Sequence, residues 1–211
     1  MQSLLHAYDM ANSPIIAATP EDSRRLFEES GALLNGHFRL TSGLHSNQYF
    51  QCATLLEQAA YSEKIAGDMA AIVKEWQPDV VLSPALGAII FGYELSRALG
   101  IRNIFAERPE GKFELRRGFS LKPGERVVIA ENVITTGGSV VETAEMARAL
   151  GADVVGYAVI VDRSGGRFAP QEPVVAYASL TAQTFDPDNC DLCKAGLPIT
   201  KPGSRVFQQS T

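Results

Sequence analysis

The chain has 211 residues, of which 45% are hydrophobic and 20% are charged, and its formal net charge is −5. This length suits one domain with a small appendage, and the acidic balance argues against nucleic acid or a membrane surface as the main partner. No apolar run approaches the roughly 20 residues that span a bilayer, the N-terminus lacks a secretory signal pattern, and cysteines are sparse, so we expect a cytoplasmic protein.

The N-terminal part of the chain predicts an arm followed by a helix. Residues 1–18 are weakly patterned. Thr19 is suited to cap a helix, Pro20 to occupy its first position, and Asp22 to complete a capping box. We expect this helix to end at Gly31.

A β-hairpin is predicted next, because the segments 38–40 and 48–52 alternate around a Ser-Gly turn. The hairpin could cover a ligand or simply form an edge of the fold. His37 and His45 lie in this region, but no third ligand follows at metal-binding spacing. We therefore expect each to be a surface or turn histidine.

Residues 55–76 predict one long amphipathic helix, which Pro78 ends. The apolar run 79–82 then predicts a buried strand, and the turn 83–90 leads from it into a helix over 91–99. This turn is rich in small residues and could cradle a phosphate, although a plain connection explains it equally well.

Residues 101–106 predict a third strand, and the segment 107–118 after it is unusual. It contains four basic and three acidic residues, two glycines and one proline, and it has no apolar helical face. It could be a solvated hairpin, or a lid that brings cations to an anionic leaving group. Its position between two strands favours the lid.

The stretch 126–139, RVVIAENVITTGGS, carries the strongest functional signal. The run 127–130 predicts a buried parallel strand, and 140–150 predicts a helix that Gly151 ends. Between them lie Glu131, Asn132, Val133, Ile134, Thr135, Thr136, Gly137, Gly138 and Ser139. Such a turn aims backbone N–H groups and a helix dipole at one point, and its hydroxyls add further donors. We predict that it binds the phosphate of a phosphorylated sugar, whose diol or accompanying Mg²⁺ suits the Glu131 carboxylate.

The run 154–161 predicts another strand, which ends at Asp162 and Arg163. The Arg163 guanidinium could bind a carboxylate bidentately, or the pair could form a surface salt bridge. A last strand is predicted over 174–179.

The tail is rich in proline and glycine and contains Cys190 and Cys193. One Cys-x-x-Cys pair supplies half of a zinc site, and Cys52 is isolated in the sequence. Metal binding would need ligands from elsewhere or from a second chain, so we predict no metal-ligating residues.

The segment ENVITTGGS resembles the motif by which type I phosphoribosyltransferases bind 5-phosphoribosyl 1-diphosphate (PRPP). It is most similar to the version of this motif in the orotate phosphoribosyltransferases. In that family the turn holds the 5′-phosphate and two acids hold the ribose hydroxyls. The second acid is usually Asp, but Asn132 stands here. An amide can still bond a hydroxyl, although it brings no charge for a cation.

Other segments extend this resemblance. The hairpin resembles the family's hood over the pyrimidine, with matches at Phe38, Leu40, Ser42, Gly43, Ser46 and Tyr49. Asp162-Arg163 is similar to the family's Asp-Arg, whose Arg binds the orotate carboxylate. The loop 107–118 resembles one that supplies a Lys to the pyrophosphate in an active site shared by a dimer. Lys112 would be that Lys, with Arg108 at the loop base, whereas Glu114 replaces the family's usual His.

The resemblance covers most of residues 20–205 and implies an α/β fold: a mainly parallel central sheet flanked by helices, as in type I phosphoribosyltransferases, with a small N-terminal hood. Alternating strands and helices indicate the same class. We expect a single domain over 1–211, with the hood contributed by about 19–52 and the C-terminal tail.

The resemblance also implies the reaction, which converts orotate and PRPP into orotidine 5′-monophosphate and pyrophosphate in pyrimidine biosynthesis. Mg²⁺ bound with PRPP is the implied cofactor, and a homodimer is the implied assembly. The implied catalytic residues are Lys112, Arg108 and Glu131. PRPP would be held by residues 131–139 with Arg108 and Lys112, and orotate by Thr135, Arg163, Ser42 and Gly43. The alternatives are transfer to another base and a non-catalytic regulator that binds PRPP or a nucleotide.

Overall fold

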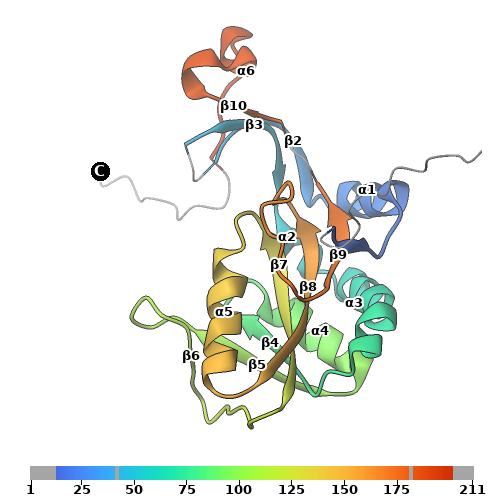
Figure 1. The fold of residues 1–211 in the computed structure, drawn as a ribbon. Helices are drawn as coiled ribbons and strands as arrows, with labels where there is room; N and C mark the ends of the chain where they lie inside the picture. The colour runs from blue at the N-terminus through green and yellow to red at the C-terminus, as the bar shows by residue number, and fades with distance from the viewer. Residues whose placement is uncertain (1–12, 41–42, 181–182, 202–211) are drawn as a thin grey trace, which may run out of the picture.

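The structure is a computed structural model that describes residues 13–40, 43–180 and 183–201 (Figure 1). Its centre is a seven-stranded sheet in the order β1-β9-β8-β7-β4-β5-β6, in which only the β5–β6 pair is antiparallel. The strands are β1 (Ile15–Ile16), β4 (Val80–Pro84), β5 (Arg102–Glu107), β6 (Glu114–Leu115), β7 (Arg126–Ile134), β8 (Asp153–Asp162) and β9 (Val174–Ser179). The predicted fold class, a mainly parallel sheet flanked by helices, is confirmed.

Helices cover both faces of this sheet (Figure 1). α3 (Ala59–Val73) and α4 (Ile89–Leu99) lie on one face, and α5 (Gly138–Ala149) lies on the other. The described chain also contains α1 (Pro20–Glu29), α2 (Cys52–Leu56) and, away from the central sheet, α6 (Asp191–Lys194), with short 3₁₀ turns at Lys74–Trp76 and Pro187–Asn189. Successive side chains of β7 point to opposite faces of the sheet and contribute to two separate core clusters. Val128 and Ala130 pack in the cluster that contains α3 and α4, whereas Val127 and Ile129 pack in the cluster that contains α5.

A second, three-stranded antiparallel sheet rises from one end of the central sheet (Figure 1). Its strands are β2 (Leu33–Arg39), β3 (His45–Phe50) and β10 (Thr184–Phe185), in the order β10-β3-β2. The predicted hairpin is confirmed as β2–β3, and the tail contributes its third strand. We call this unit the hood sheet.

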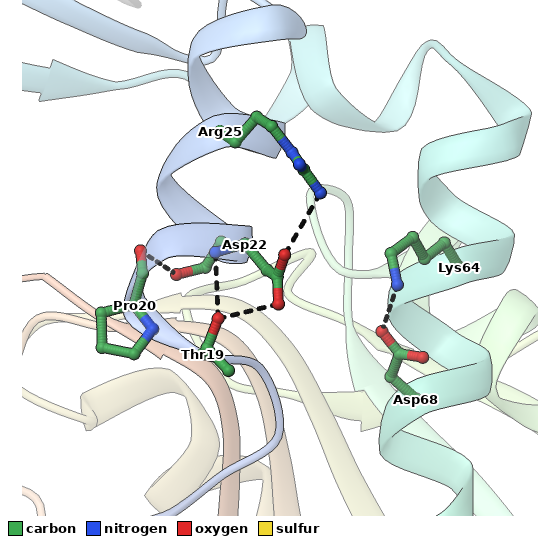
Figure 2. A network of polar contacts seen from close by, with 7 residues as sticks. Thr19, Pro20, Asp22, Arg25, Lys64 and Asp68 are labelled. Atoms are coloured by element: carbon green, nitrogen blue, oxygen red, sulfur yellow. Dashed lines mark hydrogen bonds and ion pairs between the residues drawn. The ribbon is translucent and has the colours of Figure 1, made fainter.

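The start of α1 is capped as predicted (Figure 2). The Asp22 N–H donates to Thr19 Oγ1 at 3.1 Å, and the Thr19 hydroxyl donates back to Asp22 Oδ2 at 2.8 Å. Pro20 occupies the first turn. Figure 2 also shows two ion pairs nearby, Arg25–Asp22 at 3.2 Å and Lys64–Asp68 at 2.8 Å.

The helix predicted over 55–76 and the strand predicted over 127–130 had wrong bounds. The helix is divided, because Gln58 adopts an extended backbone (φ −93°, ψ 104°) between α2 and α3, and α3 is followed by the 3₁₀ turn Lys74–Trp76. The apolar periodicity continues across such a one-residue break. The strand predicted over 127–130 continues to Ile134, because its last residues still pair with β8. In the described ranges, no helix is both long and apolar enough to span a membrane.

Candidate active site

β7 carries Glu131 and Asn132 to the carboxyl edge of the sheet, where open α/β sheets bind ligands. Both side chains fold back on the strand. Glu131 Oε1 accepts the Asn132 N–H at 2.8 Å, and Asn132 Oδ1 accepts the Val133 N–H at 2.7 Å. The second Glu131 oxygen and the Asn132 amide nitrogen have no hydrogen-bond partner in the described part of the chain, so both are available to a ligand.

Glu131 is only 9% exposed, and its burial raises the pKa of the carboxyl from 4.5 to about 7. The hydrogen bond from the Asn132 N–H opposes this shift. Near neutral pH the carboxyl is therefore close to its titration midpoint. A cation or a pair of sugar hydroxyls at this position would favour the charged form.

The turn after β7 presents the open end of a helix. Gly137 precedes α5 with φ +81°, and no side chain caps the helix. The N–H groups of the first helical turn have no intrahelical partners, so they are available to an anion. A pocket at this turn is lined by Glu131 and by Val133, Ile134, Thr135, Thr136, Gly137, Gly138, Ser139 and Val140. The structure thus brings together nearly all of the residues predicted to hold the phosphorylated sugar.

Gly137 is required at its position for two reasons. Its positive φ disfavours any residue with a side chain. An added Cβ would also lie 2.4 Å from Phe168 Cδ2, and Phe168 is buried in the α5 core. The loop after β8 therefore packs directly against the turn.

That same loop places an additional cation, Arg167, beside the turn. Its Nε donates to the Ser164 carbonyl at 2.8 Å, and one terminal nitrogen lies 3.4 Å from the Thr135 carbonyl. Arg167 was not among the residues predicted from the sequence. The available signal was its position after two glycines, Gly165 and Gly166, at the end of a strand.

The turn between β4 and α4 also reaches this edge. A Cβ at Gly87 would lie 2.6 Å from Asn132 Nδ2. The turn predicted as a second cradle therefore lies against the amide side chain that follows Glu131. Any side chain at position 87 would displace Asn132.

Arg163 lies at the end of β8 and is partly buried. No carboxylate lies within ion-pair distance of its guanidinium among the residues described, so the alternative of a surface salt bridge with Asp162 is not observed. Asp162 instead accepts the Ser164 N–H at 2.7 Å and holds the turn. Burial lowers the pKa of Arg163, and nearby Tyr49 of β3 opposes that shift. A partly buried cation without an acid is suited to bind an anionic ligand.

The hood sheet brings Tyr49 of β3 toward Arg163. The rings of Phe38 and Tyr49 lie 5.8 Å apart, and Gly43 adopts φ +88° in the hairpin turn. Ser42, the other predicted orotate contact in this turn, lies outside the described residues.

The loop after β5 is a hairpin, in which β5 and β6 pair antiparallel. It projects from one side of the domain (Figure 1). Arg108 is ion-paired with Glu142 of α5, and its guanidinium carbon lies 4.1 Å from the centre of the Phe113 ring. Glu142 also accepts the Phe113 N–H at 2.9 Å. In this arrangement Arg108 is engaged within its own chain.

The remaining cations of the loop differ in their partners. Arg117 forms two hydrogen bonds with Glu107, at 2.6 and 3.1 Å, and Arg116 lies 3.6 Å from Glu114. Lys112 is exposed and has no ion pair in the ranges that the structure covers. It is therefore the cation of the loop that is available to a ligand or to another chain.

The two histidines of the hood sheet are buried, contrary to prediction. His37 and His45 are 4% and 7% exposed, so the expectation of surface or turn histidines was wrong. Their rings meet edge to face across β2 and β3, with centroids 4.8 Å apart. Alternation along the hairpin places them on the side that the C-terminal tail covers.

Comparison with known proteins identifies the relatives of this chain. The model of the phosphoribosyl transferase domain matches residues 53–188. The orotate phosphoribosyltransferase of Desulforamulus reducens is 49% identical over 180 residues, which cover 85% of this chain and 94% of the relative. That of Pelotomaculum thermopropionicum is 50% identical over 189 residues, covering 89% and 98%.

Solved structures show the same fold. The orotate phosphoribosyltransferase of Aeropyrum pernix superposes with a TM-score of 0.59 at 25% identity, over 74% of this chain and 93% of that one. The Mycobacterium tuberculosis orotate phosphoribosyltransferase in complex with PRPP superposes with a TM-score of 0.60 at 20% identity, over 81% and 97%.

Proposed function

The chain belongs to the phosphoribosyltransferase family, among the orotate phosphoribosyltransferases, and on that premise we propose that it transfers the ribose 5-phosphate of PRPP to orotate. The products are orotidine 5′-monophosphate and pyrophosphate, and the step belongs to pyrimidine nucleotide biosynthesis. The observation that carries the proposal is the juxtaposition of an uncapped helix start, a carboxyl at the preceding strand end and, at the neighbouring strand end, Arg163, which has no ion pair in the part of the chain that the structure describes.

The geometry suits a sugar phosphate held at one end and a charged base at the other. The turn 135–139 binds the 5′-phosphate through the N–H groups of α5, and Arg167 adds positive charge beside it. Glu131 and Asn132 bind the ribose hydroxyls. Arg163 binds the orotate carboxylate, with Thr135 and the hood around the ring. Holding both reactants in line removes much of the entropic cost of the transfer.

Departure of pyrophosphate leaves an oxocarbenium-like ribose, so the leaving group must be neutralised. Lys112 supplies one cation. Arg108 supplies another once it exchanges Glu142 for the leaving group. Mg²⁺ bound with PRPP is part of the proposal, because the free Glu131 oxygen and the oxygens of PRPP are the donors that this hard cation prefers. Its role is to reduce the negative charge of the pyrophosphate.

The proposal includes a homodimer with shared active sites. Leu86, Ile90 and Tyr93 are 82%, 50% and 57% exposed. They follow one another at helical spacing from the turn into α4 and form an apolar face that a second copy would bury. Lys112, on the projecting loop, would then act in the site of the partner copy. A cytoplasmic location is also proposed, because all three cysteines are unpaired thiols.

The test is pyrophosphate release from PRPP with Mg²⁺ in the presence of orotate, uracil, adenine or hypoxanthine, together with chromatographic detection of the nucleotide. Of the four bases, we expect only orotate to cause pyrophosphate release, with one orotidine 5′-monophosphate formed for each pyrophosphate released. Release with another base would assign a different acceptor. Binding of PRPP without release in the presence of orotate would indicate the non-catalytic regulator.

A further inference from the structure

Four potential metal ligands converge in the hood sheet. His37 lies on β2, His45 on β3, Cys190 immediately before α6 and Cys193 within α6. One ligand atom from each lies within 4.8 Å of all the others. His37, His45 and Cys190 are 4%, 7% and 1% exposed, while Cys193 closes the cluster on the outer side. Two segments about 150 positions apart in the sequence therefore meet at one point.

The distances match those between ligands of a tetrahedral zinc ion. With Zn–N bonds of about 2.0–2.1 Å and Zn–S bonds of about 2.3 Å, a nitrogen and a sulfur ligand lie about 3.6 Å apart, and two nitrogens about 3.3 Å apart. Cys190 Sγ and Cys193 Sγ lie 3.6 and 3.7 Å from His37 Nε2, and Cys193 Sγ lies 3.4 Å from His45 Nδ1. The two histidine nitrogens are 3.0 Å apart.

Hydrogen bonds alone do not account for this convergence. His37 Nδ1 lies 2.9 Å from the Leu197 carbonyl, which can only accept, so Nδ1 carries the proton. In the neutral ring, Nε2 then has a single lone pair directed into the cluster. His45 Nδ1 and both cysteine sulfurs all crowd this one acceptor. A cation at the centre would accept a lone pair from each of the four atoms.

The contact between His37 and Leu197 also has the form of a metal site's outer shell. A ligating histidine generally donates its other ring N–H to a carbonyl or carboxylate, which fixes the tautomer and the ring orientation. Here the carbonyl comes from the same tail that supplies both cysteines. The arrangement therefore orients a ligand and fastens the tail in one step.

We propose that His37, His45, Cys190 and Cys193 bind one Zn²⁺ ion that fastens the C-terminal tail to the hood hairpin. Two histidines and two cysteines are a donor set that zinc prefers, and four protein ligands leave no open position, which marks a structural site. Binding releases the two thiol protons to solvent, because zinc binds thiolates. The site lies in the hood sheet and stands apart from α5 (Figure 1).

The tail needs such a fastening because its own elements are very short. β10 has two residues and α6 has four, and helices of this length are not stable alone. Besides β10, a bridge between Phe38 and Thr200 joins the tail to the hairpin, with hydrogen bonds of 2.8 and 2.9 Å. Small units with little core are commonly stabilised by a metal ion.

The first test is metal analysis of the untagged, full-length protein purified without chelator. We expect about one zinc per chain by mass spectrometry. Replacement by Co²⁺ should produce the intense visible absorption of a tetrahedral ion together with a thiolate-to-cobalt charge-transfer band. A protein that contains no zinc and binds neither ion on addition would overturn the proposal, as would a Cys190–Cys193 disulfide in the freshly purified protein.

The second test uses matched cysteine variants. Cys193→Ser should lose most of the zinc, whereas Cys52→Ala should retain it, because Cys52 lies in the main core and outside the cluster. Equal zinc content in both variants would contradict the assignment. If Cys193→Ser does not fold, chelation of the wild-type protein replaces it: hydrogen exchange should rise in 184–200 and in β2–β3, and Zn²⁺ but not Mg²⁺ should reverse the rise. Unchanged exchange after complete removal of zinc would overturn the fastening role.

Discussion

Glu131 is a buried carboxyl, and its burial disfavours the charged form. Its pKa in the folded state, about 7, lies above the ordinary 4.5, so the folded protein holds this proton more tightly than the unfolded chain does. The stability that this protonation contributes is complete below about pH 4.5, declines as the pH rises, and is lost above about pH 7. At neutral pH, the charged form of Glu131 that a ligand contact would use therefore lowers the stability of the unliganded protein.

Glu131→Gln should remove this pH dependence. The Gln side-chain oxygen can still accept the Asn132 N–H, and it carries no charge to desolvate. Between pH 4.5 and 8, the free energy of unfolding of the wild-type protein should fall by about 3 kcal/mol relative to the variant. Urea unfolding of both proteins at the two pH values measures the difference, and parallel pH profiles would contradict it. Activity should be strongly reduced in the variant.

Two arginines at neighbouring positions of the site should separate the two substrates. Arg163→Ala removes the cation proposed to pair with the orotate carboxylate, so it should raise the KM for orotate by roughly 100-fold and leave the KM for PRPP nearly unchanged. Arg167→Ala is the matched control. Arg167 lies beside the phosphate turn, so its loss should raise the KM for PRPP instead. Steady-state kinetics with each substrate varied in turn measure both values.

An equal effect of Arg163→Ala on both KM values would remove its role in selecting the base. The unfolding transition of each variant provides the control for folding. Neither arginine belongs to the hydrophobic core clusters, so both variants should remain folded.

At the scale of elements, the candidate site is formed by β7, the turn at Gly137 and α5, which follow one another directly in the chain. β7 brings the carboxyl to the sheet edge, Gly137 reverses the chain, and α5 begins without a side-chain cap. The glycine is constrained both by its backbone and by Phe168 beneath it. The turn is therefore packed closely against the loop after β8.

Gly137→Ala should lower both stability and PRPP binding. The positive φ and the 2.4 Å approach to Phe168 together should reduce the free energy of unfolding by about 2–4 kcal/mol. Gly138→Ala is the control for stability, because its φ is not positive and the nearest atom to an added Cβ is 3.8 Å away. Thermal unfolding of the two variants measures the difference. Equal melting temperatures would show that the turn yields to the added methyl group.

At the scale of the whole molecule, the proposed dimer divides the active site between chains. Lys112 lies on a projecting loop, whereas Arg163 lies at the sheet edge. Mixing Lys112→Ala with Arg163→Ala under subunit exchange should therefore restore activity. With random exchange, half of the dimers carry one intact site, so about a quarter of the wild-type activity is expected.

The control mixture combines Lys122→Ala with Lys112→Ala. Lys122 is an exposed lysine beyond the loop, so Lys122→Ala alone should be fully active. The activity of this control mixture should be the same before and after subunit exchange. Absence of recovery in the first mixture, with exchange verified by mass spectrometry of differently labelled subunits, would place Lys112 and its site on one chain.

The elements and the turn between β7 and α5 were predictable because their signals are local. β-branched runs, the Thr19 cap and the Thr/Gly/Ser turn each act over a few residues. The break at Gln58 was not predictable in this way, because one extended residue leaves the apolar periodicity intact. The engagement of Arg108 by Glu142 was not predictable either, since it joins a loop to a helix 34 positions away.

By itself, the sequence determined the α/β class, the turn between β7 and α5 and the family, because periodicity and a contiguous motif are local features of the chain. Only the tertiary structure decided that Arg163 has no acidic partner among the described residues and that Arg167 reaches the turn. It also decided that two histidines predicted at the surface are buried with two cysteines 145 to 156 positions away. Contacts of that kind depend on how separate elements pack against one another. They produce no local or periodic pattern in the sequence from which they could be predicted.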